Sequence, residues 1–111
     1  MNWIDLADES QLSSLKELSK QKAQLIFKHS TRCNISHMAK SRLERSAQPS
    51  TVDFYYLDLI KHRQLSAKIS EDFSVSHKSP QILLIKNGEC VYDESHSGIH
   101  MDDILEQLLL K

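Results

Sequence analysis

The amino-acid sequence predicts an α/β domain in which helices cover both faces of a mixed four-stranded sheet. Short apolar segments alternate with longer segments whose apolar residues recur at helical spacing. A strand–helix–strand unit crosses over right-handed, so the first two long strands should be parallel. Asn87-Gly88 is a strong two-residue turn, which makes the last two strands an antiparallel hairpin.

The size and composition of the chain fit a single globular domain spanning residues 1–111. Hydrophobic residues make up 40% and charged residues 26% of the 111 positions, which is ordinary globular usage. The chain holds only two Gly and two Pro, and no linker or low-complexity tract divides it. A net charge of −1 provides no basic field, so we expect no nucleic-acid partner.

Two helices and a strand are predicted in the first half of the chain. Leucines at helical spacing within residues 10–20 predict a surface helix, and the apolar residues 23–27 predict a buried strand. Residues 28–33 are polar and are predicted to form a loop. A second helix starts at Cys33 and stops before Pro49. Its predicted apolar face consists of Ile35, Met38, Ala39, Leu43 and Ala47.

The second half of the chain continues this alternation. Residues 51–59 predict a strand, and apolar side chains at every fourth position from Leu65 to Phe73 predict a helix. Segments 81–86 and 89–93 flank the hairpin turn as strands. A closing helix has an apolar stripe made of Met101, Ile104, Leu105, Leu108 and Leu109.

This order of elements is that of the thioredoxin fold, a three-layer arrangement to which residues 3–6 would add a fifth strand at the edge of the sheet. Proteins of that fold place a reactive cysteine where the loop after a central strand becomes a helix, and Cys33 holds that position. They also carry a cis-proline directly before the hairpin, which corresponds to Pro80 after Ser79.

Three stretches near these positions resemble one particular family. Residues 27–36 (FKHSTRCNIS), 76–81 (SHKSPQ) and 95–96 (SH) look like the bacillithiol-system redox-active monothiol proteins, the YtxJ-like family. The resemblance implies a monothiol redox protein in the cytosol of a bacterium that uses bacillithiol, a low-molecular-weight thiol. It also implies removal of bacillithiol from S-thiolated client proteins, with no bound cofactor. Asn34 departs from the family motif, which often has proline directly after the cysteine.

Cys33 is the candidate catalytic nucleophile. A thiol at a helix N-terminus faces unpaired backbone N–H groups and the positive end of the helix dipole, which stabilise the nucleophilic thiolate. Arg32 and His29 are near enough in sequence to add positive charge. The alternative is an inert buried cysteine, but the polar neighbours of Cys33 do not describe an apolar pocket.

Ser36 is the second candidate catalytic residue. It follows Cys33 by three positions, where dithiol oxidoreductases have their resolving cysteine, and residues so spaced are neighbours on a helix. Its hydroxyl is expected to donate a hydrogen bond to the Cys33 thiolate. It cannot form a disulfide, so a second thiol from solution must resolve a mixed disulfide on Cys33. The alternative is a solvated helix serine without a role.

Cys90 is predicted to be a structural residue. It lies in the returning strand of the hairpin, at the edge of the sheet. A disulfide needs Cα atoms within ~7 Å of each other, and the predicted topology does not bring Cys90 that close to Cys33.

Five residues are candidates for substrate binding. In the thioredoxin fold the backbone before the cis-proline pairs with an extended substrate backbone, which points to Ser79 and Pro80; the alternative is an ordinary loop proline. Thr31 and Arg32 border the reactive cysteine. Lys28 and Arg32 could attract the carboxylates of bacillithiol, although a lysine at a strand end also commonly extends into solvent.

A metal site and a membrane location are not expected. His29, Cys33 and His37 recur at every fourth position, but no closed set of four ligands is visible. The longest aliphatic run, residues 82–85, is much shorter than the ~20 residues that span a bilayer. The acidic start of the chain is unlike a signal peptide, so the two cysteines indicate the reducing cytoplasm.

The leading hypothesis is therefore a monothiol, bacilliredoxin-like thiol–disulfide oxidoreductase. The competing hypothesis is a non-catalytic binding module with a thioredoxin fold, in which Cys33 is a passive target of thiolation. An alkylating reagent distinguishes the two, because a catalytic thiol should react well below pH ~8.5, the ordinary pKa of a cysteine.

Overall fold

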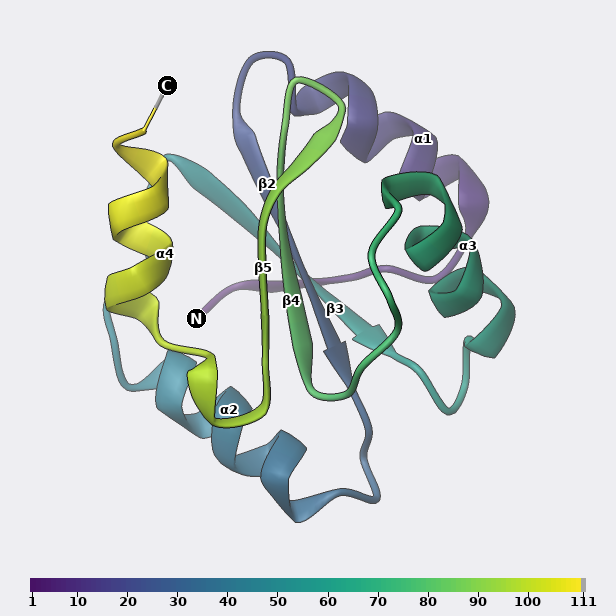
Figure 1. Cartoon of the computed structure of the whole chain (residues 1–111), viewed down its shortest axis with the longest axis vertical. Coiled ribbons are helices and arrows are strands. Elements are labelled where there is room, and N and C mark those ends of the chain that lie inside the picture. Colours follow the sequence, from purple (N-terminus) through teal and green to yellow (C-terminus); the bar gives the residue numbers. More distant parts are fainter. Residues whose placement is uncertain (111) are drawn as a thin grey trace.

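A five-stranded mixed sheet between two layers of helix forms the protein (Figure 1). The structure is a computed structural model that describes residues 1–110. The elements are β1 (Trp3–Asp5), α1 (Glu9–Leu18), β2 (Ala23–His29), α2 (Asn34–Glu44), β3 (Val52–Asp58), α3 (Arg63–Phe73), β4 (Gln81–Lys86), β5 (Glu89–Ser95), a 3₁₀ turn (His96–Gly98) and α4 (Met101–Leu108). The three-layer α/β fold predicted from the sequence is confirmed.

The strands lie in the order β1-β3-β2-β4-β5. β1 and β2 both run parallel to β3, whereas β4 is antiparallel to β2 and β5 is antiparallel to β4. The edge strand that residues 3–6 were expected to add is present as β1. The central strand β2 therefore has partners on both sides, and its C-terminal end leads directly into the loop that carries Cys33.

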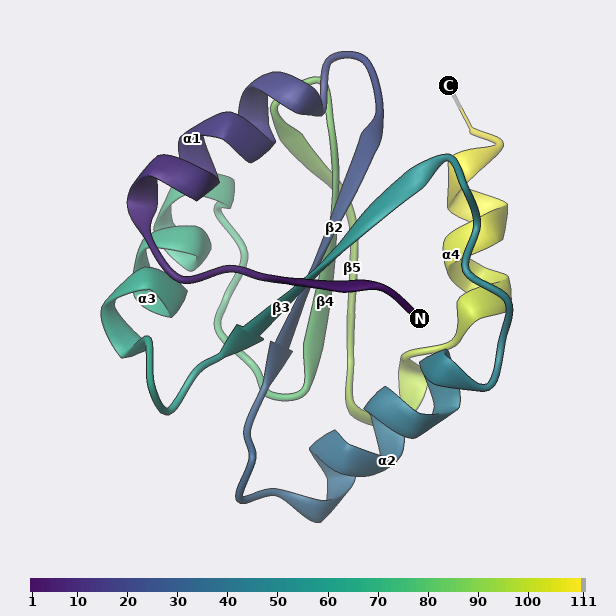
Figure 2. The same ribbon diagram turned by 180° about the vertical axis from the view of Figure 1, so that it is seen from behind.

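Two hydrophobic clusters lie on the two faces of the sheet. Helices α1 and α3 cover one face and α2 and α4 cover the other (Figures 1 and 2). Successive side chains of a strand point to opposite faces, so Leu25 and Phe27 of β2 pack toward α2 and α4 while Ile26 packs toward α1 and α3. The same alternation decides on which face each polar residue at the end of β2 lies.

Strand β2 is longer than its apolar stretch. Lys28 and His29, predicted to lie in a loop, belong to the strand and are buried. Lys28 pairs with Leu57 of β3 and Gln81 of β4, so the backbone ladder continues on both sides. Polar side chains can occupy a central strand when neighbouring helices supply hydrogen-bond partners, and both residues have such partners.

Helix α2 buries a narrower face than predicted. Ala39 and Leu43 are fully buried, but Ile35 is 54% and Met38 63% exposed. Ala47 lies beyond the helix end and is exposed. The first turns of α2 lie past the ends of the strands in both views (Figures 1 and 2), and only the later part of the helix rests on the sheet.

The hairpin turn has the backbone that Asn-Gly predicts. Asn87 and Gly88 have φ angles of 53° and 77°, the left-handed conformation that both residues of a tight hairpin turn require. The backbone N–H of Asn87 donates to the carbonyl of Ser19 at 2.9 Å. The N–H of Gly88 donates to the Ser19 hydroxyl at 2.8 Å, so the turn is fixed to the end of α1.

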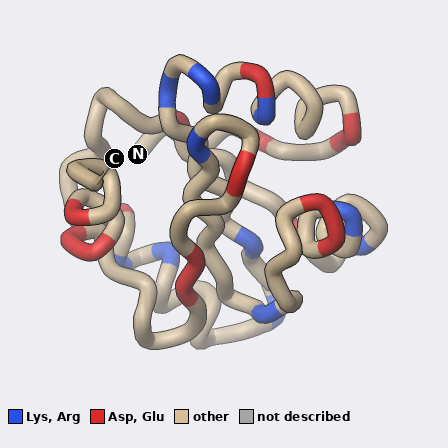
Figure 3. The backbone as a smooth tube through the Cα atoms, turned by 45° about the horizontal axis from the view of Figure 1, so that its top comes forward, with Lys and Arg blue, Asp and Glu red and all other residues tan. Residues whose placement is uncertain are grey.

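Acidic and basic residues are interspersed over the fold in Figure 3. None of the helices within residues 1–110 has the length and apolar character needed to cross a membrane.

Candidate functional site

Cys33 lies at the first, capping position of α2. Its backbone is extended (φ −115°, ψ 119°), and the helix begins at the next residue, Asn34. The Cys33 N–H donates to the Ser30 carbonyl at 3.1 Å, and its own carbonyl accepts from the His37 N–H at 3.1 Å. The side chain is partly exposed, and the first turn of α2 contains no acidic residue. The thiol thus stands at the N-terminal end of a helix, where the backbone N–H groups of the first turn have no intrahelical partners.

Ser36 is fully buried one turn into α2. Its hydroxyl accepts a hydrogen bond from the Ser30 N–H at 3.0 Å and lies 2.7 Å from Nδ1 of His29. The expected hydrogen bond from Ser36 to Cys33 is not formed. The hydroxyl instead holds the loop that carries Cys33 against the end of β2, because it joins the helix to both Ser30 and His29.

His29 is a buried neutral imidazole at the end of β2. Burial, with the nearby charges of His37 and Lys40, lowers the pKa of His29 to about 4. His29 therefore does not add the positive charge expected beside Cys33 at neutral pH. Since the Ser36 oxygen already accepts from Ser30, its single proton is available for Nδ1 of His29.

No sequence pattern indicated the His29–Ser36 pair. The two residues are seven positions apart, across the end of a strand and the start of a helix. The pair forms because β2 extends to His29 and α2 turns back along the end of the sheet. A polar residue directly after a buried apolar stretch is the one local signal available, and it fits a loop as well as the end of a strand.

Thr31 and Arg32 form the exposed rim of the loop before Cys33. The Thr31 carbonyl lies 2.9 Å from Nε2 of His37, which donates to it. Nδ1 of His29 is hydrogen-bonded to Ser36, and Nε2 of His37 donates to the Thr31 carbonyl. Neither of these two nitrogens is therefore directed at Cys33 as a metal ligand. Across residues 1–110, the structure contains no group of three His, Cys, Asp or Glu side chains that could hold a metal ion.

Ser79 and Pro80 lie beside the end of β2. The antiparallel pairing of β2 with β4 reaches Lys28 opposite Gln81, so Pro80 adjoins His29, from which the Cys33 loop departs. The Ser79–Pro80 peptide bond is cis. The Pro80 carbonyl accepts from the His96 N–H at 3.0 Å, which fixes this segment to the end of β5. The Ser79 hydroxyl oxygen is buried and has no hydrogen-bond partner among the described residues.

A family model described as monothiol bacilliredoxin BrxC matches residues 4–104. The chain belongs to the monothiol bacilliredoxin BrxC family. It is thus a redox thiol protein with a thioredoxin fold, and the resemblance inferred from the residues around Cys33 is confirmed.

Solved structures support the fold of this bacilliredoxin family member. A protein provisionally described as an oxidoreductase with a thioredoxin fold is 28% identical, with a TM-score of 0.83 over 95% of this chain and 92% of that one. Thioredoxin from Schistosoma mansoni is 24% identical, with a TM-score of 0.72 over 98% and 96% of the two chains. Thioredoxin from Trypanosoma brucei brucei is 12% identical, with a TM-score of 0.76 over 96% and 88%. The two thioredoxins show a shared fold only.

Lys28 lies on the opposite face of the sheet from α2. Its side chain is fully buried, and its ammonium group donates to the Ser66 carbonyl at 3.0 Å and to the Ser70 hydroxyl at 2.8 Å. Both partners belong to α3. Lys28 therefore neither extends into solvent nor acts on the Cys33 thiol directly, because the alternation of β2 directs it away from that thiol.

Cys90 is remote from Cys33. It pairs with Ile85, which in turn pairs with Gln24 near the start of β2, whereas Cys33 follows the end of that strand. Gln24 and His29 are separated by roughly 16 Å of strand, too far for a disulfide between the two cysteines. The Cys90 thiol donates to the Tyr92 carbonyl at 3.4 Å. Burial raises the pKa of Cys90 to about 11, so it remains a thiol at neutral pH.

Proposed function

We propose that this protein removes bacillithiol from mixed disulfides on client proteins, with Cys33 as the nucleophile. The observation that carries the proposal is a partly exposed thiol at a helix N-terminus, while the second thiol lies near the opposite end of the sheet and is protonated. The match to the monothiol bacilliredoxin family supports bacillithiol as the co-substrate.

The proposed reaction has two exchange steps. The Cys33 thiolate attacks the bacillithiol sulfur of the mixed disulfide, the bond to the client sulfur breaks, and the client leaves as a thiolate that takes a proton from solvent. A second bacillithiol thiolate then attacks the bacillithiol sulfur held on Cys33. This step restores the Cys33 thiolate and releases bacillithiol disulfide. The two electrons that reduce the client thus come from bacillithiol, and no bound cofactor takes part.

The neighbouring residues have distinct proposed roles. The backbone at Ser79 and Pro80 borders the reactive loop and would pair with the extended backbone of a client. Thr31 and Arg32 form the rim over which the client approaches. Ser36 is a positioning residue, since it acts on the loop rather than on the thiol. The proposal supposes a cytoplasmic setting, where thiols stay reduced.

A time course of bacillithiol release tests the proposal. A client protein carrying a bacillithiol mixed disulfide is incubated with bacillithiol and the protein, and both proteins are followed by mass spectrometry. We expect transient addition of bacillithiol to Cys33 and loss of bacillithiol from the client over many turnovers. Cys33→Ser should abolish turnover and leave the cooperative unfolding transition in place, because the partly exposed side chains are nearly isosteric. Cys90→Ser should retain turnover.

The passive-target hypothesis makes the opposite prediction. Cys33 would accumulate one bacillithiol per chain, the client would not be released beyond one equivalent, and added bacillithiol would not regenerate the thiol. Turnover that persists in Cys33→Ser would contradict the assignment of the nucleophile.

A further inference from the structure

The ammonium group of Lys28 is buried without a negatively charged partner. Its side chain is fully buried, and its donors meet the Ser66 carbonyl, the Ser70 hydroxyl and, at 3.4 Å, Nδ1 of His77. No carboxylate among residues 1–110 lies within ion-pair distance of it. Burial lowers the pKa of Lys28 to about 8, so the group is still mostly charged at pH 7. A buried charge without a counter-ion is costly, which makes the site favourable for an anion.

His77 extends this donor array toward solvent. Lysine can only donate, so Nδ1 of His77 must be the acceptor in its contact with Lys28. Burial and the charge of Lys28 lower the pKa of His77, which keeps the ring neutral at pH 7. The neutral ring then carries its proton on Nε2, where it is a hydrogen-bond donor on the side away from Lys28.

A cavity of about 370 Å³ adjoins this group, within the size range of small-molecule sites. Its walls contain two hydroxyls, an imidazole and a guanidinium, together with an apolar portion, and no carboxylate. The lining residues are Leu59, Arg63, Ser66, Ala67, Ser70 and His77.

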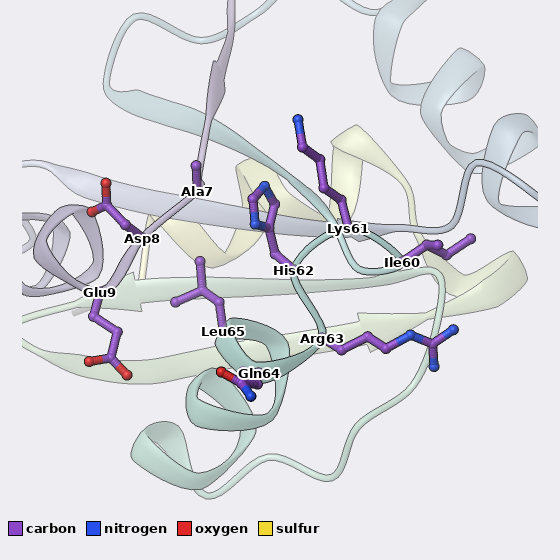
Figure 4. A pocket seen from close by; sticks show the side chains of 9 residues that line it. All are labelled: Ala7, Asp8, Glu9, Ile60, Lys61, His62, Arg63, Gln64 and Leu65. Atoms are coloured by element: carbon purple, nitrogen blue, oxygen red, sulfur yellow. The ribbon is translucent and has the colours of Figure 1, made fainter.

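A second cavity, which shares Arg63 with the first, has a different character. It measures about 470 Å³ and includes the carboxylates of Asp8 and Glu9 beside Lys61 and Arg63 (Figure 4). Figure 4 shows the Arg63 side chain extending away from those two carboxylates. The Arg63 guanidinium is therefore available to a ligand in the first cavity. The second cavity contains both acidic and basic side chains, so its charge indicates no one kind of ligand.

The walls of the first cavity belong to the segments that also border Cys33. Leu59 donates its N–H to the carbonyl of His29 at 3.0 Å, and the chain runs from His29 into the loop of Cys33. His77 lies on the loop that ends at Ser79 and Pro80. The cavity is thus linked to the Cys33 loop through His29 and to the proposed client-binding segment through the loop from His77 to Pro80.

We propose that this cavity binds a carboxylate of the low-molecular-weight thiol that exchanges with Cys33. Arg63 and Nε2 of His77 would contact the carboxylate, the Ser70 hydroxyl would add a hydrogen bond, and Lys28 would provide the balancing charge from beneath. The inference rests on the proposed function for the identity of the thiol, and it adds the place where the acidic end of that thiol is recognised.

Binding of succinate, a dicarboxylate without a thiol, tests the cavity independently of any exchange reaction. Two-dimensional ¹H–¹⁵N NMR at pH 7 and constant ionic strength should show saturable shifts at Ser66, Ser70 and His77. Succinamide, which has the same shape without charge, should produce none, and phosphate should bind more weakly.

Arg63→Gln and Lys28→Met should each raise the Kd for succinate about tenfold or more, because charge-assisted hydrogen bonds are the strong ones. Lys61→Gln, a charge loss in the adjoining loop outside this cavity, is the matched control and should bind as the unaltered protein does.

Exchange kinetics then identify the source of the carboxylate. The ratio of kcat/KM for a bacillithiol mixed disulfide to that for a 2-mercaptoethanol mixed disulfide should fall about tenfold in Arg63→Gln, since only the first carries carboxylates. Succinate should compete with the bacillithiol substrate.

Two results would overturn the inference. One is the absence of saturable succinate binding, or succinate binding that Arg63→Gln leaves unchanged. Arg63 is exposed, so this substitution should leave the fold intact. The other is succinate binding with an unchanged kinetic ratio, which would mean that the cavity serves a free carboxylate. If the unaltered protein exchanges neither mixed disulfide, the proposed function fails, and the succinate titration still reports on the cavity separately.

Discussion

At the scale of single residues, the site consists of a partly exposed thiol, Cys33, and a buried polar pair, Ser36 and His29. Cys33 has the helix end and solvent access that a nucleophile needs. Ser36 and His29 are buried and hydrogen-bonded to each other. Their contact fixes the position of the loop before Cys33, so they should influence stability more directly than thiol chemistry.

Ser36→Ala should therefore lower the free energy of unfolding by about 1–3 kcal/mol, because it leaves buried polar groups of His29 and Ser30 without a partner. Ser41→Ala is the matched control, since Ser41 is exposed on the same helix and should change stability by less than ~0.5 kcal/mol. Urea unfolding of both variants measures the difference. Equal effects of the two substitutions would mean that the Ser36 hydroxyl has no structural role.

Protonation of His29 should destabilise the protein at mildly acidic pH. Its pKa is about 4 in the folded chain against ~6.5 when unfolded, so between these values the unfolded state binds the proton more strongly. The contribution of His29 is complete above pH ~6.5 and is lost as the pH falls toward 4, by up to about 3 kcal/mol. His77 contributes in the same direction.

His29→Phe keeps a ring among Phe27 and Tyr56 and removes the titration. Urea unfolding at a series of pH values between 7 and 4 should show a shallower loss of stability in this variant than in the unaltered protein. Parallel curves for the two proteins would contradict the assignment of a buried neutral imidazole.

The position of Cys33 could be predicted from the sequence, but the partners of Ser36 could not. A change from an apolar strand to a helical repeat is a local pattern, and it places Cys33 at the junction. The partners of a buried hydroxyl depend on how a strand end and a helix meet, which local spacing does not determine. Lys28 illustrates the same limit. From the sequence, a polar residue after an apolar run fits a loop as well as a strand, and only the packing of α3 against β2 provides the hydrogen-bond acceptors that allow Lys28 to be buried in the strand.

At the scale of elements, α2 shows why helical periodicity alone did not identify its buried face. Apolar residues recur on more than one side of this helix, and only the sheet decides which side is covered. Its first turns lie past the strand ends, so Ile35 and Met38 face solvent. The hairpin was easier to predict, because the φ angles required at Asn87 and Gly88 are a local property.

Two substitutions in α2 should separate the covered side from the exposed one. Leu43→Ala should cost about 2–5 kcal/mol, since Leu43 is fully buried in the core. Met38→Ala should cost less than ~0.5 kcal/mol, since Met38 is 63% exposed. Thermal or urea unfolding measures both, and a large cost at Met38 would show that the helix is rotated relative to this arrangement.

At the scale of the whole molecule, the sheet keeps the two thiols apart in position and in chemistry. Cys33 follows the C-terminal end of β2, and Cys90 lies on the edge strand β5 near the opposite end of the sheet. The Cys33 thiol lies at a helix end, whereas Cys90 is partly buried against the core cluster under α1 and α3, and burial raises the pKa of Cys90 to about 11. The fold itself therefore produces a monothiol protein from a chain with two cysteines.

This separation predicts strongly unequal alkylation of the two thiols. With a pKa of about 11, Cys90 should be a thiolate at pH 7.5 roughly 300-fold less often than a cysteine with the ordinary pKa of ~8.5. Because the thiolate is the reactive form, iodoacetamide should modify Cys33 at least about 100-fold faster. Peptide mass mapping over a time course measures both rates in the same sample. Unfolding in urea is the control, since it exposes both residues and should remove most of the difference. Comparable rates in the folded protein would mean that Cys90 is accessible, and a second thiol could then compete for the mixed disulfide on Cys33.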